Sequence, residues 1–417
     1  MMSRYDRPMK TWFAAGVTLC VALAALRSTS LAQSTDFAIT SLTSPARSGS
    51  AQPQLTVSGR GVLLSWIERA GDLATLKFSE RTRQGWTPAR TVASGRDWFV
   101  NWADVPSVLR LADTSLYAHW LQKSGPDTYA YDVRLARSTD DGRTWAASFT
   151  PHHDRTQTEH GFASLFQTPG AGLGLVWLDG RAMKGGHEEH GGGDMSVRGA
   201  VYDRQGKQML EAAIDLRVCE CCPTAAAVTA EGPIVAYRDR SDSEVRDIYV
   251  SRLVSGKWTP PTPVHRDNWQ IAACPVNGPA LSANGRNVVL AWFTAQADEG
   301  RAYVAFSQDS GQSFGKPIRV DDAGTLGRVD VALLDDGSAA ATWIEFADGK
   351  AQFRLRRITA TGERSPSGTV AGLAATRASG YPRMAHFGGE LVFAWTDSAT
   401  PSMVKTASVP TAPWATR

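Results

Sequence analysis

The sequence predicts an all-β fold built from seven repeats, and three observations support this prediction. A short apolar strand ending in an aromatic residue recurs at intervals of 51 to 60 residues. Each of these strands is followed by a segment in which apolar and polar residues alternate, and no segment has a sustained helical period. Four strands per repeat at this spacing predict a seven-bladed β-propeller of four-stranded blades. The recurring aromatic residues are Trp66, Trp120, Trp177, Tyr237, Trp292, Trp343 and Trp395.

The N-terminus predicts a secretory signal peptide over residues 1–32, which leaves 33–417 as a single propeller domain. Basic residues come before an uncharged apolar run over residues 11–26, and Ala32 ends a Ser-Leu-Ala cleavage sequence. The run is shorter than the roughly 20 apolar residues that a membrane-spanning helix needs. We therefore expect a secreted or periplasmic protein with no membrane span after the signal is removed.

The strand count predicts how the ring closes. The repeats provide seven second strands and seven third strands, but only six fourth strands, because the last third strand, near Met403 to Val409, runs into the C-terminus. The segment Phe37–Leu42 has the alternation of a strand and can supply the missing outer strand. This pairing would cover an otherwise bare sheet edge. The alternative is a six-bladed propeller with one repeat miscounted.

Composition excludes some partners and leaves others open. The net charge is +3, from 44 basic and 41 acidic residues, so nothing indicates binding to nucleic acid or to an anionic membrane. Four cysteines remain after the signal peptide, an even number that permits disulfides outside the cytoplasm. They are Cys219, Cys221, Cys222 and Cys274.

Two turns between third and fourth strands share one pattern. In each, a carboxylate is placed to accept backbone N–H groups, a glycine to take a positive φ and an aromatic residue to plug the blade. The residues involved are Ser138, Asp140, Gly142 and Trp145 in the first turn, and Ser307, Asp309, Gly311 and Phe314 in the second.

These turns match the Asp-box, or BNR, pattern Ser-x-Asp-x-Gly-x-Thr-Trp, with Phe for Trp in the second. The chain thereby resembles the sialidase (neuraminidase) superfamily of Asp-box propellers over nearly all its length after residue 32. The resemblance implies a sialidase-like glycoside hydrolase if the protein is an enzyme. Those enzymes have six blades. They bind the substrate carboxylate with three arginines, use a tyrosine nucleophile that a glutamate assists, and use an aspartic acid as the catalytic acid. Their Arg-Ile-Pro sequence is absent here, where residues 51–57 stand in its place.

Most of the chemically unusual residues fall on one predicted face. In a propeller, the loops between second and third strands share a face with the connections from one blade to the next, whereas the Asp-box turns lie on the opposite face. The first face carries the cysteines and a His-rich loop over residues 179–194. All four cysteines lie on the connections that enter two adjacent blades.

The cysteines predict a site for a thiophilic metal, Cu(I) or Zn(II), because soft thiolates suit these ions. The predicted ligands are Cys219, Cys221, Cys222, Cys274, His187, His190 and Met195. Two alternatives stay open for the cysteines: a disulfide from Cys274 to one of the other three, or a reactive redox thiol. For the histidines the alternative is a solvated, flexible loop.

Arginines and acids on the same face predict an anion site, because arginine matches a carboxylate well. The candidate catalytic residues are Arg181, Arg238, Arg240, Asp239 and Glu244. The alternative is that these charges form salt bridges between blades.

Three functions therefore follow from the sequence. The first is an exported propeller that binds a small ligand or a thiophilic metal on this face. The second is an exo-glycosidase of sialidase type that acts on a carboxylate-bearing sugar. The third is a disulfide-stabilised scaffold with a protein partner.

Overall fold

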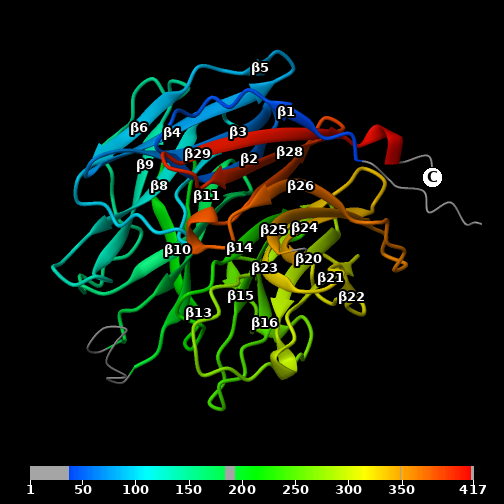
Figure 1. The fold of residues 1–417 in the computed structure, drawn as a ribbon. Coiled ribbons are helices and arrows are strands. Elements are labelled where there is room, and N and C mark those ends of the chain that lie inside the picture. Colours follow the sequence, from blue (N-terminus) through cyan, green and yellow to red (C-terminus); the bar gives the residue numbers. More distant parts are fainter. Residues whose placement is uncertain (1–36, 184–192, 348, 415–417) are drawn as a thin grey trace, which may run out of the picture. The chain divides into compact units, whose positions relative to one another are not determined.

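The chain forms seven antiparallel sheets arranged in a ring (Figure 1). The computed structural model describes residues 37–183, 193–347 and 349–414, and residues 1–36 with the predicted signal peptide lie outside this range. Each sheet is one blade, numbered here from 1 to 7 along the chain. The described residues contain three short 3-10 turns, η1 (Gln296–Asp298), η2 (Arg377–Ser379) and η3 (Ala412–Trp414), and no α-helix.

The blades use strands that follow one another in the sequence. Blades 1 to 3 contain β2 (Ser50–Ser58), β3 (Gly61–Ala70), β4 (Leu73–Thr82), β5 (Gly85–Trp86) and β6 (Arg90–Gly95); β7 (Ser107–Arg110), β8 (Leu116–Lys123) and β9 (Tyr131–Ser138); and β10 (His160–Thr168), β11 (Gly172–Asp179), β12 (Ser196–Tyr202) and β13 (Gln208–Asp215). Blades 4 and 5 contain β14 (Ala225–Thr229), β15 (Gly232–Arg238), β16 (Ile248–Val254), β17 (Lys257–Trp258) and β18 (Thr262–Pro263); and β19 (Ala280–Asn284), β20 (Asn287–Thr294), β21 (Arg301–Ser307) and β22 (Ile318–Arg319). Blades 6 and 7 contain β23 (Thr325–Leu333), β24 (Ala339–Ala347), β25 (Lys350–Ile358) and β26 (Gly368–Leu373); and β27 (Arg383–Phe387), β28 (Glu390–Asp397), β29 (Met403–Pro410) and β1 (Thr40–Leu42).

The outer edges of the blades depart from the ideal four strands. In blades 1 and 4 the outer strand is broken into two short pieces that pair with the same third strand. Pro88 lies in one break and Pro260 and Pro261 in the other, and proline has no N–H to donate to the ladder. Blade 2 has three strands, and a single bridge from Phe149 to Leu135 takes the position of the fourth.

The first and last strands of the chain close the ring, as the strand count predicted. Strand β1 pairs antiparallel with β29, with Thr40 opposite Ser408 and Leu42 opposite Thr406. The ring of Phe37, just before β1, lies 4.9 Å from the ring of Trp414. Seven blades are therefore present, and the six-bladed alternative is wrong, because each of the seven repeats forms its own sheet.

The core lies between blades. In the described part of the chain, seven clusters of buried apolar side chains each join two adjacent blades, including the last to the first. The recurring aromatic residue belongs to the second strand, which is nearly buried along its length. Trp66, Trp177 and Trp343 are 0 % exposed, and each donates its indole N–H to an acid two residues later. Burial of these large side chains makes the contact between blades the main source of stability.

The two turns singled out in the sequence form closed hydrogen-bond rings. The Asp140 carboxylate accepts the Thr144 N–H at 2.9 Å and its hydroxyl at 2.6 Å, and Gly142 has a φ of 77°. The second turn repeats these contacts between Asp309 and Ser313. The aromatic residues that follow, Trp145 and Phe314, pack on the clusters between blades.

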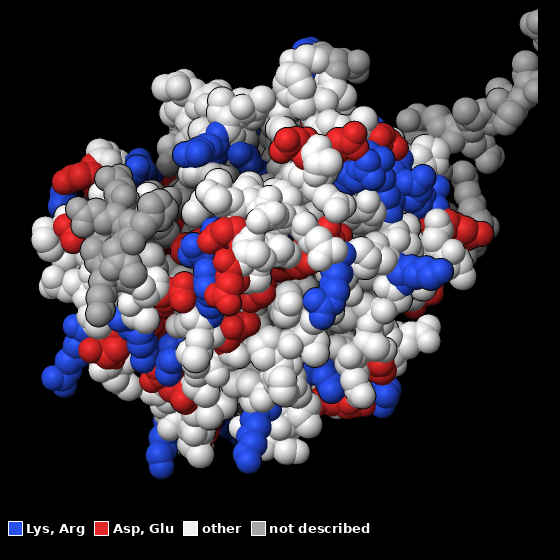
Figure 2. All heavy atoms as spheres, turned by 90° about the horizontal axis from the view of Figure 1, so that it is seen from below, with Lys and Arg blue, Asp and Glu red and all other residues white. Residues whose placement is uncertain are grey.

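The strand directions place the connections between blades at one end of the ring. Because all neighbouring strands are antiparallel, the connections between blades and the loops between second and third strands emerge together, opposite to the two Asp-box turns. Seen from below, basic and acidic side chains are interspersed on the surface (Figure 2).

Within the residues described, no helix has the length and apolar character needed to cross a bilayer.

A buried polar cluster joins blade 2 to blade 3 at this end. The rings of His152 and His160 stack at 3.8 Å with their planes 5° apart. His152 donates to Asp154 at 2.8 Å, and His160 contacts Asp154 at 3.2 Å and Asp132 at 3.4 Å. Arg181 pairs with Asp179 in the same cluster at 2.6 Å.

The cluster sets the protonation of its histidines. Burial alone would lower the pKa of His160, but hydrogen bonds to Asp132 and Asp154 and the charge of Asp179 outweigh it and raise this pKa to about 9. Burial, followed by the nearby charge of His160, lowers the pKa of His152. The stack therefore pairs one charged with one neutral imidazole at neutral pH.

Removing the closing strand should destabilise the ring. A chain that starts at Thr43 lacks Phe37, Ile39 and strand β1, so the edge of β29 is bare and part of an apolar cluster is exposed. We expect a loss of about 2–4 kcal/mol in the free energy of unfolding, measured by denaturant unfolding. The control is a chain that starts at Phe37. Equal stability of the two chains would contradict the role of β1 in closure.

The His160 cluster should make stability depend on pH. A folded-state pKa of about 9 lies above the unfolded value of about 6.5, so the stabilisation is complete below pH 6.5 and is lost as the pH rises through 9. The full effect is about 3 kcal/mol. In His160→Gln the fall in stability between pH 6.5 and 9.5 should flatten, whereas the exposed neighbour His153→Gln should behave like the wild type. An unchanged pH profile in His160→Gln would refute this assignment.

Candidate functional site

The connection between β13 and β14 holds three of the four cysteines against the neighbouring loop. The Cys219 N–H donates to the Arg238 carbonyl at 2.9 Å, and Val218 donates to the Met195 carbonyl at 2.8 Å. These bonds hold the connection between the start of the β15–β16 loop and the end of the β11–β12 loop. Cys219 is 0 % exposed and Cys222 is 1 % exposed, whereas Cys221 is half-buried.

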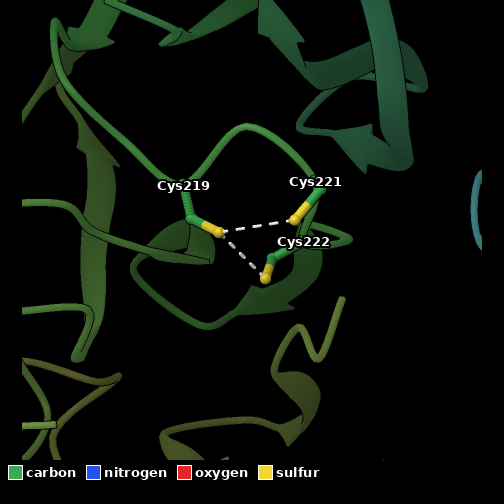
Figure 3. A group of neighbouring side chains, drawn as sticks. All are labelled: Cys219, Cys221 and Cys222. Carbon is green, nitrogen blue, oxygen red and sulfur yellow. Dashed lines mark hydrogen bonds between the residues drawn. The ribbon is translucent and has the colours of Figure 1, made fainter. Parts of the chain in front are cut away.

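The sulfur atoms of these cysteines converge. The Cys219 Sγ lies 3.1 Å from the Cys222 Sγ and 3.9 Å from the Cys221 Sγ, and the three atoms all lie within 4.8 Å of one another (Figure 3). A disulfide bond is about 2.05 Å long, so these are contacts between separate thiols. All four cysteines are free thiols. Cys274, on the connection that enters blade 5, is exposed, and its proximity contributes to raising the pKa of Cys221.

Positive charge and hydrogen bonds favour a thiolate at Cys219. Burial works against ionisation, but hydrogen bonds with Cys221 and Cys222 and the nearby charge of Arg246 together hold the pKa of Cys219 well below its usual value. The Arg246 Nη1 donates to the Cys219 Sγ at 3.2 Å. Hydrogen bonding with Cys219 raises the pKa of Cys221, and burial raises the pKa of Cys222. Cys219 is therefore the member of the cluster whose ionisation these contacts favour.

Acidic side chains tie this guanidinium in place. Arg246 is 3 % exposed and donates to Glu220 and Glu244, each at 2.9 Å. Arg240 pairs with the same two glutamates, and its Nη2 lies 2.6 Å from Glu244. The predicted residues Arg240 and Glu244 thus belong to an ion-pair network that surrounds the cysteine connection.

The remaining predicted catalytic residues also have partners within the protein. Arg238 is 1 % exposed, donates to the carbonyls of Asn277, Arg246 and Phe293, and lies over the Trp269 ring. Arg181 belongs to the histidine cluster described above. Burial and the nearby charge of Asp215 raise the pKa of Asp239 to about 7. The structure brings Arg238 and Arg240 close to the cysteines, and leaves Arg181 with blade 3.

The other predicted metal ligands have different positions. His187 and His190 lie outside the described residues. Met195 is 0 % exposed and packs in the apolar cluster between blades 3 and 4, with Cys221 at the edge of that cluster. A second group that could hold a metal is Asp132 with His152 and His160, which the sequence analysis did not predict as a site.

A pocket of about 300 Å³ opens beside Cys274. Its wall includes Trp102, Asn277, Arg328 and Arg377, which come from four separate segments of the chain. Arg328 lies 4.7 Å from the centre of the Trp102 ring and donates to the Gly380 carbonyl at 2.9 Å. Burial and the nearby charge of Arg377 lower the pKa of Arg328. In the described part of the chain neither arginine forms a salt bridge with a carboxylate.

Sequence reasoning missed this pocket because its residues share no spacing or pattern. Each comes from a different blade connection or strand end, and only ring closure brings them together. Arg328 also has a φ of 51° at an irregular point of β23, a strained conformation that only the structure reveals.

A tyrosine paired with acids also occurs, but within the core. The Tyr131 hydroxyl donates to Glu159 at 2.6 Å and lies 3.3 Å from Asp104. Burial, followed by the charge of Glu159, raises the pKa of Asp104 to about 8. Tyr131 is 1 % exposed and Asp104 is 2 % exposed, so this trio is a buried hydrogen-bond network between blades 2 and 3.

Comparison with known proteins finds likeness in structure alone. No protein-family model and no curated protein matches the sequence. Among solved structures, the chain is similar to the polysaccharide lyase Uly1, with a TM-score of 0.53 and 9 % identity over 87 % of this chain and 90 % of that chain. A mutant of the NanB sialidase from Streptococcus pneumoniae gives a TM-score of 0.44 and 7 % identity, over 89 % of this chain and 94 % of that one. An α-L-arabinofuranosidase from Fusarium graminearum gives 0.45 and 13 %, over 74 % and 92 %. The chain therefore shares its β-propeller fold with Uly1.

Proposed function

We propose that this protein is an exported propeller that binds a thiophilic metal ion, Cu(I), through Cys219, Cys221 and Cys222. The observation that carries the proposal is the convergence of three free sulfur atoms within 4.8 Å of one another. With metal–sulfur bonds of about 2.3 Å, three sulfurs around one ion lie about 4 Å apart. The sulfur contacts of 3.1 and 3.9 Å need little rearrangement to reach this spacing.

The surroundings support an ion of low charge with soft ligands. Three thiolates around Cu(I) carry a net charge of −2, and the guanidinium of Arg246 lies against one of them at 3.2 Å. Soft thiolates select Cu(I) and Zn(II), but a structural zinc site needs four ligands. Cys274 is the described candidate for the fourth, because its connection lies against the cluster, where the Asn277 N–H donates to the Cys222 Sγ at 3.4 Å.

The reduced protein should bind one Cu(I) per chain. In competition with a chromogenic Cu(I) chelator, Cys219→Ala and Cys222→Ala should each lower the affinity at least 100-fold, because each removes a buried sulfur. The matched control Cys274→Ser should keep tight Cu(I) binding while it abolishes four-coordinate Zn(II) binding. A thiol titration first confirms four free thiols per chain, and thermal melts confirm folding. A fully reduced wild type that does not compete for Cu(I) would overturn the proposal.

A second candidate function is binding of an anionic sugar in the pocket beside Cys274, and it rests on a specific observation. Arg328 and Arg377 face this pocket without a carboxylate partner in the described residues, and the Trp102 ring holds the Arg328 guanidinium in position. Guanidinium groups match carboxylates. The fold is shared with Uly1, which is a polysaccharide lyase. A carboxylate-bearing saccharide therefore suits the pocket.

Calorimetry with uronic-acid oligosaccharides tests this second function. We expect Arg328→Gln to weaken binding at least tenfold, because it removes the better-buried charge. The control is Arg143→Gln, which changes an exposed arginine on an Asp-box turn at the opposite end. Equal binding of neutral and anionic oligosaccharides, or unchanged binding by Arg328→Gln, would exclude it. Turnover of a fluorogenic sialoside, lost in Arg181→Ala or Arg240→Ala, would instead favour a sialidase-type hydrolase.

A further inference from the structure

The four sulfur atoms form a path from solvent to the core. Cys274 is exposed, Cys221 is half-buried, and Cys219 and Cys222 are buried. The Cys219 Sγ contacts the sulfurs of both Cys221 and Cys222. The segment that follows Cys274 lies against this cluster, because the Asn277 N–H donates to the Cys222 Sγ at 3.4 Å, and Cys274 is an electrostatic neighbour of Cys221. The innermost pair has the closest contact, 3.1 Å between sulfurs. Figure 3 shows the side chains of Cys221 and Cys222 directed toward that of Cys219.

The solvent end of this path opens into a pocket that can admit a solute. Cys274 lines the pocket of about 300 Å³, so a small disulfide can approach its sulfur from solvent. The buried pair has the Cys-x-x-Cys spacing, which permits a disulfide within one short loop, whereas Cys221 and Cys222 are direct neighbours and would form a strained ring.

We propose that this protein exchanges thiols with disulfides, that Cys274 is the entry thiol, and that the product is a disulfide between Cys219 and Cys222. The consequence for the metal site rests on the proposed function, since this disulfide removes two of the three ligands. The cluster would then bind metal only when reduced.

The exchange proceeds by successive transfers of one disulfide bond. Cys274 attacks a sulfur of an external disulfide RSSR; a Cys274–SR bond forms and one RS⁻ leaves. Cys221 attacks the Cys274 sulfur and the second RS⁻ leaves. Cys219 then attacks Cys221 and releases Cys274, and Cys222 attacks Cys219 and releases Cys221. Overall, two cysteine thiols are oxidised, RSSR is reduced to two RSH, and the two thiol protons pass to the leaving thiolates.

Reaction with oxidised glutathione tests the proposal, with peptide mapping of the disulfide and measurement of released glutathione. We expect two glutathiones per chain and a Cys219–Cys222 disulfide in the wild type. Cys274→Ser should slow its formation at least tenfold without changing the final disulfide. Cys221→Ser should stop the relay and leave a mixed disulfide on Cys274. These readouts use no metal.

Three results would overturn the proposal: no thiol consumed in the wild type, a wild-type rate in Cys274→Ser, or a final disulfide that includes Cys274. The two proposals fail separately. A wild type that binds Cu(I) but does not react with glutathione disulfide would refute exchange and leave metal binding intact. A wild type that reacts as expected but binds no Cu(I) would refute metal binding alone.

Discussion

Antiparallel pairing within every blade decides which segments of this chain meet. Because each strand reverses direction, the connections that enter the blades all emerge at one end of the ring, however far apart they are in the sequence. Residues 219–222 and residues 274–277 are separated by a whole blade along the chain, yet the Asn277 N–H donates to the Cys222 Sγ at 3.4 Å. The thiol cluster, the ion-pair network around it and the adjoining pocket all depend on this alternation.

Within that frame, local electrostatics differentiates side chains of the same type. Cys219 meets a guanidinium and two hydrogen-bonding thiols, whereas Cys222, three residues away, has burial as its dominant influence, so their pKa values shift in opposite directions. His160 and His152 show the same contrast in one stacked pair. In both cases one residue lies nearer a charged group that offsets the cost of burial: Arg246 for Cys219, and the neighbouring aspartates for His160.

The sequence predicted the fold better than it predicted the site. Strand period, the recurring aromatic and the missing fourth strand are local patterns, and they sufficed for seven blades and for the pairing of the first strand with the last. The cysteines were visible because they are rare and lie on equivalent connections. Salt bridges of Glu244 and Arg240 were foreseen as an alternative, but the carbonyl contacts of Arg238 were not, because they depend on distances across loops. Arg328 and Trp102 belong to no motif, and only the closed ring brings them to one pocket.

The seam of the ring lies between the two ends of the polypeptide. Strand β1 is among the first parts of the described chain to be synthesised, and β29 is among the last. The seventh blade can therefore assemble only after β29 has been synthesised, and until then β1 has no partner. The closed ring is thus the last element of this fold to become possible during synthesis, however early the first blades pair their own strands.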